Sequence, residues 1–244
     1  MKVIKLGGSL LEDTTRRAVA LSGVVAAWNS GQQIVLVHGG GKHIDARLQE
    51  LGIPKRTHAG LRITDDATLA VVVSVLAGTV NKALVAELTA LGVRAAGISG
   101  SDAGTLVAEH HPPIDGVELG HVGRVTSANR TLIQAMLTYG ILPVVSSVAQ
   151  GPDGTLLNVN ADSAATAIAE SLGARALHFI TDVAGVLDAQ GNVVPRLTLE
   201  EGHLFLASEF VTGGMKPKLE AALRALTRGV GSISIGGGTE LVAA

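Results

Sequence analysis

The sequence has no cysteine among its 244 residues, which excludes disulfides, thiolate catalysis and zinc–sulfur sites. Aromatic residues make up only 2% of the chain, so a core must be built from Val, Leu, Ile and Ala. These residues suit strands that are covered on both faces by helices rich in Ala and Leu.

Signals for membranes and nucleic acids are also missing. The opening "MKVIKL" lacks the long apolar run of a signal peptide, and no stretch reaches the length of a membrane span without a charge or a glycine cluster. The net charge is −2, with 16% charged residues, so no basic surface recruits nucleic acid or anionic lipid. We therefore expect a soluble cytoplasmic protein with neither a nucleic acid nor a membrane as partner.

The familiar nucleotide-binding motifs do not occur. No G-x-x-x-x-G-K-[ST] is present, no G-x-G-x-x-G follows a strand, and no protein-kinase catalytic loop is found. The eight histidines show no metal-ligand spacing, so we expect no metal site built from side chains. If the chain handles phosphate, it uses a different apparatus.

What the sequence does contain is an alternation of short apolar runs with longer amphipathic segments. This pattern predicts an α/β fold with a mainly parallel sheet. Strands are expected at 2–6, 34–38, 95–98, 142–146, 176–180 and 232–235, and helices at 14–29, 42–51, 65–91, 131–139, 163–172 and 215–228. Hairpins are expected within 107–125, and an irregular or hairpin segment at 54–64. Asp13 is expected to cap the first helix and Gly78 to bend the third. One domain is expected, with a hinge between two lobes near 150–160.

Two glycine runs follow expected strands: "KLGGS" at 5–9 and "HGGGKH" at 38–43. Ligands of open parallel sheets bind beyond the carboxyl ends of the strands, and glycine there lets the backbone approach a phosphate closely. Either run alone also fits an ordinary tight turn. Two runs, each accompanied by a lysine, favour an anion site, and Lys5 is its most specific residue.

Three further motifs carry polar groups. "NVNAD" (158–162) has three polar residues, at 158, 160 and 162. Capping of the following helix explains only one of them. If the segment is extended, its alternation would place all three side chains on one face. In "GGMKPKLEAAL" (213–223) Lys216 and Lys218 stand near a helix start, which favours anions. "TDVAGVLD" (181–188) is a turn that can cup a ribose or a base, although alone it is a weak signal.

Together these motifs, with "GLRIT" and "GHVG" between them, resemble the amino acid kinase family, in particular its members that phosphorylate N-acetyl-L-glutamate. The resemblance runs from residue 2 to about 226. It implies a three-layer αβα sandwich around a mainly parallel open sheet. An N-terminal lobe, about 1–157, would bind acetylglutamate, and a C-terminal lobe, about 158–244, would bind ATP. The implied reaction transfers the γ-phosphoryl group of ATP to the γ-carboxylate of N-acetyl-L-glutamate, the second step of arginine biosynthesis.

The resemblance also implies roles for individual residues. Lys5 and Lys218 would stabilise the transferring phosphoryl group, and Asp162 would hold both lysines. Phosphate donors would be Gly7 and Gly8; substrate contacts would be Gly40, Gly41, Arg62 and Asn158; nucleotide contacts would be Thr181, Asp182, Val183, Ala184, Gly185, Val186, Leu187, Phe210, Val211 and Thr212. Mg²⁺ would be held mainly by the nucleotide phosphates. A carboxylate acceptor is already a nucleophile, so no general base is needed, and positioning and charge carry the catalysis.

Two departures from the family pattern carry expectations. The first strand begins at residue 2, without the N-terminal helix that links arginine-inhibited members into hexamers, so we expect a homodimer that is insensitive to arginine. The tail is shorter than the usual ending, so we expect a trimmed nucleotide lobe. Two alternatives stay open: a sister kinase acting on carrier-bound aminoadipate, which "GLRIT" and "NVNAD" disfavour, and a non-catalytic nucleotide or amino-acid sensor, which Lys5, Lys218 and Asp162 disfavour.

Overall fold

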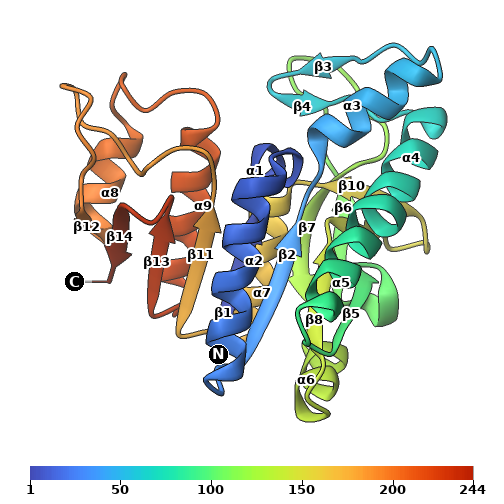
Figure 1. The fold of residues 1–244 in the computed structure, drawn as a ribbon. Helices are drawn as coiled ribbons and strands as arrows, with labels where there is room; N and C mark the ends of the chain where they lie inside the picture. The colour runs from blue at the N-terminus through green and yellow to red at the C-terminus, as the bar shows by residue number, and fades with distance from the viewer. Residues whose placement is uncertain (244) are drawn as a thin grey trace.

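An eight-stranded sheet runs through the centre of the computed structural model, which describes residues 1–243 (Figure 1). Its strands lie in the order β12 (Arg196–Thr198), β14 (Thr239–Val242), β13 (Ser232–Ile235), β11 (Ala176–Ile180), β1 (Lys2–Leu6), β2 (Ile34–His38), β8 (Leu142–Ser146) and β5 (Ala95–Ser99). All neighbouring pairs are parallel except β13 with β14. The expected mainly parallel sheet is confirmed.

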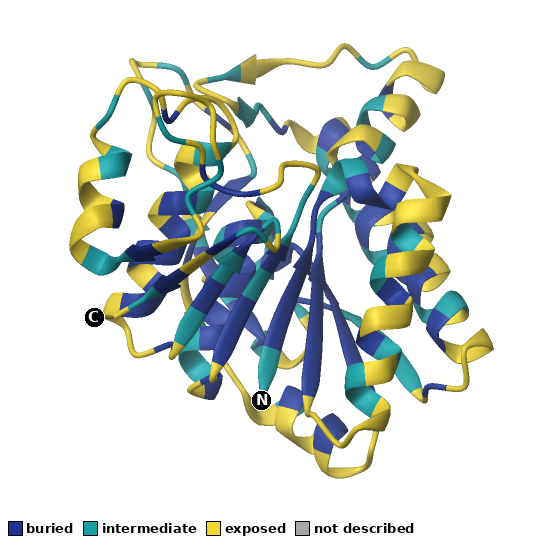
Figure 2. Cartoon of the chain, turned by 60° about the vertical axis from the view of Figure 1, so that its left-hand side comes forward, coloured by how far each residue is buried: buried dark blue, intermediate teal, exposed yellow. Residues whose placement is uncertain are grey.

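Helices cover both faces of this sheet, which confirms the three-layer architecture. One layer holds α1 (Gly8–Glu12), α2 (Thr14–Asn29), α3 (Gly41–Glu50), α4 (Asp66–Val73) and α5 (Asn81–Ala90). The other holds α6 (Thr131–Thr138), α7 (Ala161–Leu172) and α9 (Met215–Thr227), with α8 (Leu199–Leu206) against α9. Figure 2 shows buried central strands between helices whose outer faces are exposed.

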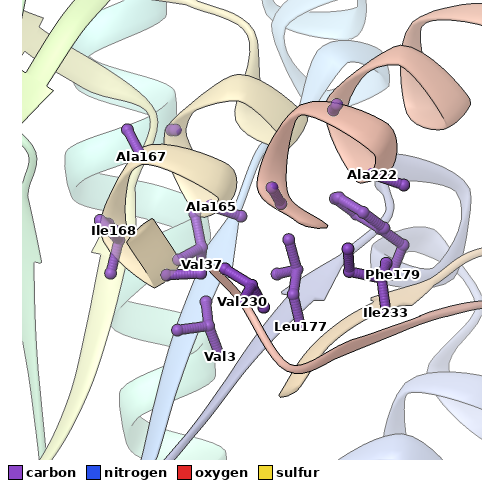
Figure 3. Close-up of a cluster of buried hydrophobic side chains, with 14 of the residues drawn as sticks. Val3, Val37, Ala165, Ala167, Ile168, Leu177, Phe179, Ala222, Val230 and Ile233 are labelled. Carbon is purple, nitrogen blue, oxygen red and sulfur yellow. The ribbon is translucent and has the colours of Figure 1, made fainter. Parts of the chain in front are cut away.

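Alternation along β1 explains how the sheet presents two different faces. Val3 belongs to the core beneath α7 and α9, whereas Ile4 and Leu6 belong to the core beneath α2 to α5. Figure 3 shows Val3, Val37 and Leu177 of the strands beneath Ala165 and Ile168 of α7. Successive side chains of a strand point to opposite faces, so Lys5 shares the face of Val3 and points toward α7.

Smaller elements stand beside the main sheet. A small closed sheet is formed by β6 (Leu106–His110), β7 (Val122–Ala128), β9 (Val148–Gln150) and β10 (Leu156–Val159). The antiparallel pair β3 (Thr57–His58) and β4 (Leu61–Arg62) forms a hairpin, and β6 pairs antiparallel with β7. The hairpin expected within 107–125 is therefore confirmed, with its second strand continuing to Ala128. Of the two forms left open for 54–64, the structure has the hairpin.

The long helical segment Asp66–Ala90 changes its winding in the middle. A π-helical turn, η1 (Ser74–Val80), joins α4 to α5 and includes Gly78, where a bend was expected. By length and composition this segment is apolar enough to cross a membrane, with a mean hydropathy of 1.9 over its best window, 39% of which is buried. The segment is long enough to span a membrane, but it is not free of charge, because it carries Lys82 and Glu87. It packs against β5 and β8 of the sheet.

Several local predictions were incomplete. Asp13 does cap α2, accepting from the N–H of Arg16 at 2.9 Å. Helices α1 and α8 and strands β9, β12 and β14 were not predicted, although the capping box of Thr198 with Glu201 marks the start of α8. In "NVNAD" the strand ends at Val159 and the helix begins at Ala161. Asp162 therefore lies in the first helical turn, and the expected alternation on one extended segment is wrong.

Candidate active site

A cavity of about 300 Å³ opens where the carboxyl ends of β1 and β2 meet α3, β4, β10, α7 and α9. β1 is flanked by β2 on one side and by β11 on the other, which is the kind of switch point where open α/β sheets bind ligands. The cavity is lined by Lys5, Gly8, Gly39, Gly40, Gly41, Ile44, Gly60, Leu61, Arg62, Leu76, Val122, Ser147, Asn158, Val159, Asn160, Ala161, Asp162 and Lys218.

Two lysines from opposite ends of the chain share one carboxylate at this cavity. Lys5 Nζ lies 2.8 Å from Asp162 Oδ1 in a close ion pair. Lys218 Nζ donates to the other oxygen, Oδ2, at 3.0 Å. The three side chains are 7%, 15% and 5% exposed in the order Lys5, Lys218, Asp162. The structure thus brings these three residues together as the sequence analysis expected.

The charges of this triad do not balance, because two ammonium groups face one carboxylate. Burial alone would raise the pKa of Asp162, but the positive charges of Lys5 and Lys218 outweigh it and hold that pKa below its usual range. Burial lowers the pKa of Lys5, and the charge of Lys218 adds to this, while Asp162 offsets part of it. The triad by itself therefore has a net charge of one positive unit, which favours an anionic ligand.

Arg62 places a second cationic group on the cavity wall. Its Nη2 donates to Asp45 Oδ1 and, at 3.2 Å, to the carbonyl of Gly41. Its Nη1 is buried and has no partner among residues 1–243. A buried unpaired guanidinium N–H is costly unless a ligand accepts from it, and a carboxylate is the matching acceptor.

Asp45 on α3 orients this arginine. Burial alone would raise the pKa of Asp45, but hydrogen bonds from Lys55 and Arg62 hold it below its usual range. Asp45 is therefore ionised at neutral pH and fixes one edge of the guanidinium group.

Asn158 connects the motifs "NVNAD" and "GLRIT". Its Nδ2 donates to Thr64 Oγ1 at 3.1 Å, and Thr64 Oγ1 donates to the carbonyl of Arg62 at 2.8 Å. Its backbone N–H donates to the carbonyl of His121 at 2.8 Å. With its nitrogen engaged, the amide of Asn158 has its carbonyl oxygen left to accept from a ligand.

The glycine runs lie side by side at the mouth of the cavity. A Cβ added at Gly8 would lie 3.7 Å from the backbone N of Gly41. Gly40 precedes the first turn of α3, so its N–H and those of that turn have no intrahelical acceptor. A Cβ at Gly40 would lie 2.9 Å from Leu76 Cδ2, so the close packing against η1 requires glycine.

Gly7 does not have the expected role. Its N–H donates to the carbonyl of Ile180 at 2.8 Å and so is not free to bind a phosphate. A Cβ at Gly7 would come within 3.0 Å of the same carbonyl oxygen. Glycine suits this position because β1 and β11 approach each other closely. The N–H of Gly7 is thus bonded within the protein, and a phosphate contact at Gly7 stays a prediction.

The two other candidate lysines lie outside the cavity. Lys42 of "HGGGKH" is exposed and its Nζ donates to Glu12 at 2.8 Å. Lys216 is exposed in the first turn of α9. Only Lys5 and Lys218 therefore form the cationic end of the site.

The expected nucleotide segments divide into exposed and buried residues. Thr181, Asp182, Val183 and Ala184 follow β11 as a partly or fully exposed turn, and Leu187, Phe210 and Thr212 are also exposed. Thr181 Oγ1 donates to Asp182 at 3.0 Å, and the charge of Asp182 acts on Lys5 by raising its pKa, against the larger lowering caused by burial. This turn therefore borders the lysine end of the cavity.

The remaining nucleotide candidates are packing residues. Val186 and Val211 belong to the hydrophobic core, and a Cβ at Gly185 would lie 2.4 Å from Thr239 Oγ1. The N–H of Val186 donates to Thr239 Oγ1 at 2.8 Å. The side chains of Val186 and Val211 and the N–H of Val186 are therefore used within the protein, and ligand contacts at Gly185, Val186 and Val211 stay a prediction.

Sequence reasoning missed two polar residues of the cavity wall. Asn160 is the cap of α7 and accepts from the N–H groups of Asp162 and Ser163 at 2.8 and 3.1 Å. Ser147 follows β8, the neighbour of β2 in the sheet. Its position after a buried strand was the available signal, because the carboxyl ends of parallel strands meet at one edge.

The arrangement suits a short ligand with anionic groups at both ends. The two lysines and the free N–H groups at the start of α3 match a phosphoryl group, and the unpaired Nη1 of Arg62 matches a carboxylate. No serine–histidine pair or other activated nucleophile lines the cavity. The site is therefore built for positioning and charge stabilisation.

Comparisons with known proteins agree with this description. A sequence model of the amino acid kinase family matches residues 1–237. The chain is 44% identical over 234 residues to an acetylglutamate kinase of Chloroflexus aggregans, covering 96% of this chain and 90% of that protein. It is 42% identical over 233 residues to one of Koribacter versatilis, covering 96% and 88%. A crystal structure of a Streptococcus mutans UA159 protein superposes with a TM-score of 0.88 at 31% identity, covering 100% and 98%.

Replacing the shared carboxylate should strongly destabilise the fold. Asp162→Asn leaves two buried ammonium groups facing each other, which should lower the free energy of unfolding by about 3–5 kcal/mol. The pKa of Asp162 is lowered in the folded state. Its contribution is therefore fully present above the unfolded pKa of about 4 and is lost as pH falls through the folded value. Urea unfolding at neutral and acidic pH measures both effects.

Asp13→Asn is the matched control for this experiment. Asp13 caps α2 and pairs with exposed Arg16, and asparagine caps helices equally well. Its unfolding free energy should stay within about 0.5 kcal/mol of wild type. Equal stability of both variants would contradict the assignment of Asp162 as the support of the two lysines.

Proposed function

Because the chain belongs to the amino acid kinase family, we propose that it transfers the γ-phosphoryl group of ATP to the γ-carboxylate of N-acetyl-L-glutamate. The product is the acyl phosphate, and the reaction is the second step of arginine biosynthesis. Relatives at 42–44% identity over 96% of the chain are acetylglutamate kinases. The observation that best supports this proposal is that Lys5 and Lys218 both pair with Asp162. The same cavity is lined by Arg62, whose Nη1 has no partner among residues 1–243.

The acceptor explains why the cavity holds no catalytic base. A carboxylate is already a nucleophile at neutral pH, so the residues need only align it with the phosphoryl group and stabilise charge in the transition state. The ammonium groups of Lys5 and Lys218 balance charge on the transferring and leaving oxygens. Asp162 holds both without taking a proton, because its pKa is lowered.

The other end of the cavity selects the substrate. Nη1 of Arg62 binds the α-carboxylate, and Asn158 with Gly40 and Gly41 contacts the rest of acetylglutamate. The orientation of Arg62 by Asp45 and the orientation of Asn158 by Thr64 support these roles. A fork-shaped guanidinium held at one edge is suited to a planar carboxylate.

ATP enters from the side of β11. Thr181 and Asp182 border the lysines, and exposed Val183, Leu187 and Phe210 offer apolar surface for the base. Phe210 packs edge-on against Phe205, with ring centroids 5.4 Å apart. No three His, Asp or Glu side chains within residues 1–243 come together as a metal site. As the resemblance implies, Mg²⁺ would be held mainly by the nucleotide phosphates and water.

The sheet supports a division into two lobes. One side of the sheet is formed by β1, β2, β8 and β5, within residues 1–157. Lys5 and the glycine run at 39–41 lie on or directly after these strands, and Arg62 lies in the same part of the chain. Strands β11, β13, β14 and β12, within 158–244, carry the ATP side and Lys218 through α9. We assign acetylglutamate binding to the first lobe and ATP binding to the second, in a cytoplasmic enzyme.

A homodimer is supported by the outer face of α4. Half-buried Leu69 and Val73 line, with exposed Ala70, a depression of about 450 Å³ that also includes Leu156. The helical segment that carries them is highly apolar, although only 39% of its most apolar stretch is buried. A second copy of the chain would cover this surface.

An ADP-release assay with a panel of acids tests the proposed function. N-acetylglutamate should be phosphorylated far faster than glutamate, aspartate or aminoadipate, because only it matches both ends of the cavity. Preference for aminoadipate would identify a sister kinase instead. If none of the acids gives ADP release, the result would reject the kinase function and favour a non-catalytic nucleotide or amino-acid sensor.

The same assay checks the lysine pair. Lys218→Ala leaves Lys5 paired with Asp162 and should lower kcat on the order of 10²-fold, the scale of one transition-state donor, with a smaller rise in KM. The control Lys216→Ala removes an exposed lysine of the same helical turn and should retain kcat.

Arg62→Lys should mainly weaken the binding of acetylglutamate. An ammonium group cannot keep the contact with Asp45 and also bind a carboxylate with the fork of a guanidinium. KM for acetylglutamate should rise about 10- to 100-fold, the worth of a charged hydrogen bond, with little change in KM for ATP. Arg56→Lys, an exposed arginine that pairs with Asp65, serves as control. An unchanged KM in Arg62→Lys would reject the carboxylate-binding role.

The oligomeric state tests the outer face of α4. Wild type should sediment as a dimer. Val73→Glu places a charge in the proposed contact and should give monomers, whereas Val19→Glu, at a residue 70% exposed on α2, should remain dimeric. A monomeric wild type, a hexamer or a dimeric Val73→Glu would each count against this assembly.

A further inference from the structure

A buried contact between His38 and Asn81 lies directly behind the glycine run of the cavity. His38 ends β2 and Asn81 begins α5, and both are 0% exposed. Asn81 Nδ2 lies 3.0 Å from His38 Nε2 and 2.9 Å from the carbonyl oxygen of Val144. Neither side chain lines the cavity, so neither touches a ligand bound there.

The surroundings of Asn81 fix the proton position on His38. Asn81 Nδ2 faces the carbonyl oxygens of Val144 and, at 3.4 Å, Ile98, while its Oδ1 accepts from Lys82 at 3.2 Å. Only the amide nitrogen can donate to carbonyls, so His38 Nε2 must accept. The ring proton is therefore on Nδ1, which donates to the carbonyl of Gly39 at 2.9 Å.

The ring stays neutral at physiological pH. Burial lowers the pKa of His38 to about 4, and the charges of His43 and Lys82 act in the same direction, while the bond to Gly39 opposes them. A neutral ring has one donor and one acceptor. Both are used here, so the orientation of the ring is fixed by its two partners.

The neighbouring backbone is shaped around this contact. A Cβ at Gly97 would lie 1.7 Å from Asn81 Oδ1, so any side chain there would displace the amide of Asn81. Lys82 Nζ donates to the carbonyl of Gly97 at 2.9 Å. The π-helical turn Ser74–Val80 ends directly before Asn81, and such a turn shifts the residues after it around the helix axis.

The carbonyl that accepts from His38 belongs to the Gly39–Gly40 peptide, which has little intrinsic preference for one orientation over the reversed one. In a trans peptide the carbonyl of Gly39 and the N–H of Gly40 point in opposite directions. Both residues are glycine and lack a Cβ, so turning this peptide over meets little steric resistance. The reversed peptide would direct a carbonyl oxygen, instead of an N–H, at an anion in the cavity that Gly39 and Gly40 line.

We propose that His38 is a positioning residue for the phosphoryl transfer. Its Nδ1–H holds the Gly39 carbonyl away from the cavity and thereby keeps the N–H of Gly40 directed at the acceptor carboxylate. This inference rests on the proposed function. It adds a residue that acts through the backbone without touching the substrate.

Two substitutions separate the donor of His38 from its acceptor. In His38→Asn the amide nitrogen lies near the position of Nδ1 and can donate to Gly39. In His38→Gln the amide lies near the position of Nε2 and leaves the Gly39 carbonyl without a donor. Both variants lose buried volume, so urea unfolding should show similar losses of stability.

Turnover should separate the two variants. With acetylglutamate and ATP, His38→Asn should keep kcat within about threefold of wild type, whereas His38→Gln should lose on the order of 10²-fold, the scale of one oriented backbone donor. KM for ATP should change little in either. Equal kcat in the two variants, or losses that follow stability alone, would overturn the role of His38.

Wild type distinguishes the two possible failures. No ADP release by wild type with acetylglutamate would overturn the proposed function and this inference with it. An active wild type with equally active variants would overturn this inference alone. Should the variants not fold, ¹⁵N NMR of histidine-labelled wild type decides: a neutral ring protonated at Nδ1 supports the proposal, and protonation at Nε2 or a charged ring at neutral pH overturns it.

Discussion

The site depends on one carboxylate, Asp162, that two buried lysines share. Lys5 comes from the first strand and Lys218 from the last long helix, and their ammonium groups would repel each other without it. The carboxylate compensates one positive charge and leaves the other, so the empty site favours an anion before any ligand arrives. A phosphoryl group in transit, with its charge spread over several oxygens, is such an anion.

The geometry of the sheet explains how such distant residues meet. Alternation along β1 sends Val3 into the core beneath α7 and sends Lys5, on the same face, toward Asp162 in the first turn of α7. The N-terminus of α7 lies beside α9, which supplies Lys218. The core between these helices and the sheet consists of small and branched aliphatic side chains (Figure 3). This packing fixes the lysines more firmly than surface loops could.

Much of the cavity is controlled by residues that do not reach it. Asp45 sets the angle of Arg62, Thr64 turns the amide of Asn158, and the pair His38–Asn81 holds the carbonyl of Gly39. Several glycines serve close approach rather than ligand binding. Gly7 permits the contact of β1 with β11, and Gly97 leaves room for Asn81. Hydrogen bonds behind the cavity wall thus hold the ligand-facing donors in position, which a flexible glycine backbone alone would not do.

The sequence by itself determined the parallel α/β architecture, most strand and helix positions and the motifs that make up the site, because apolar periodicity and glycine runs are local signals. It misplaced Asp162 on a strand and missed α8 and β14, whose short segments carry weak periodicity. Only the tertiary structure decided that Lys42 pairs outward with Glu12, that the N–H of Gly7 is already bonded, and that Gly185, Val186 and Val211 are core residues. Burial and hydrogen-bond partners depend on segments far apart in the chain, and no local pattern encodes them.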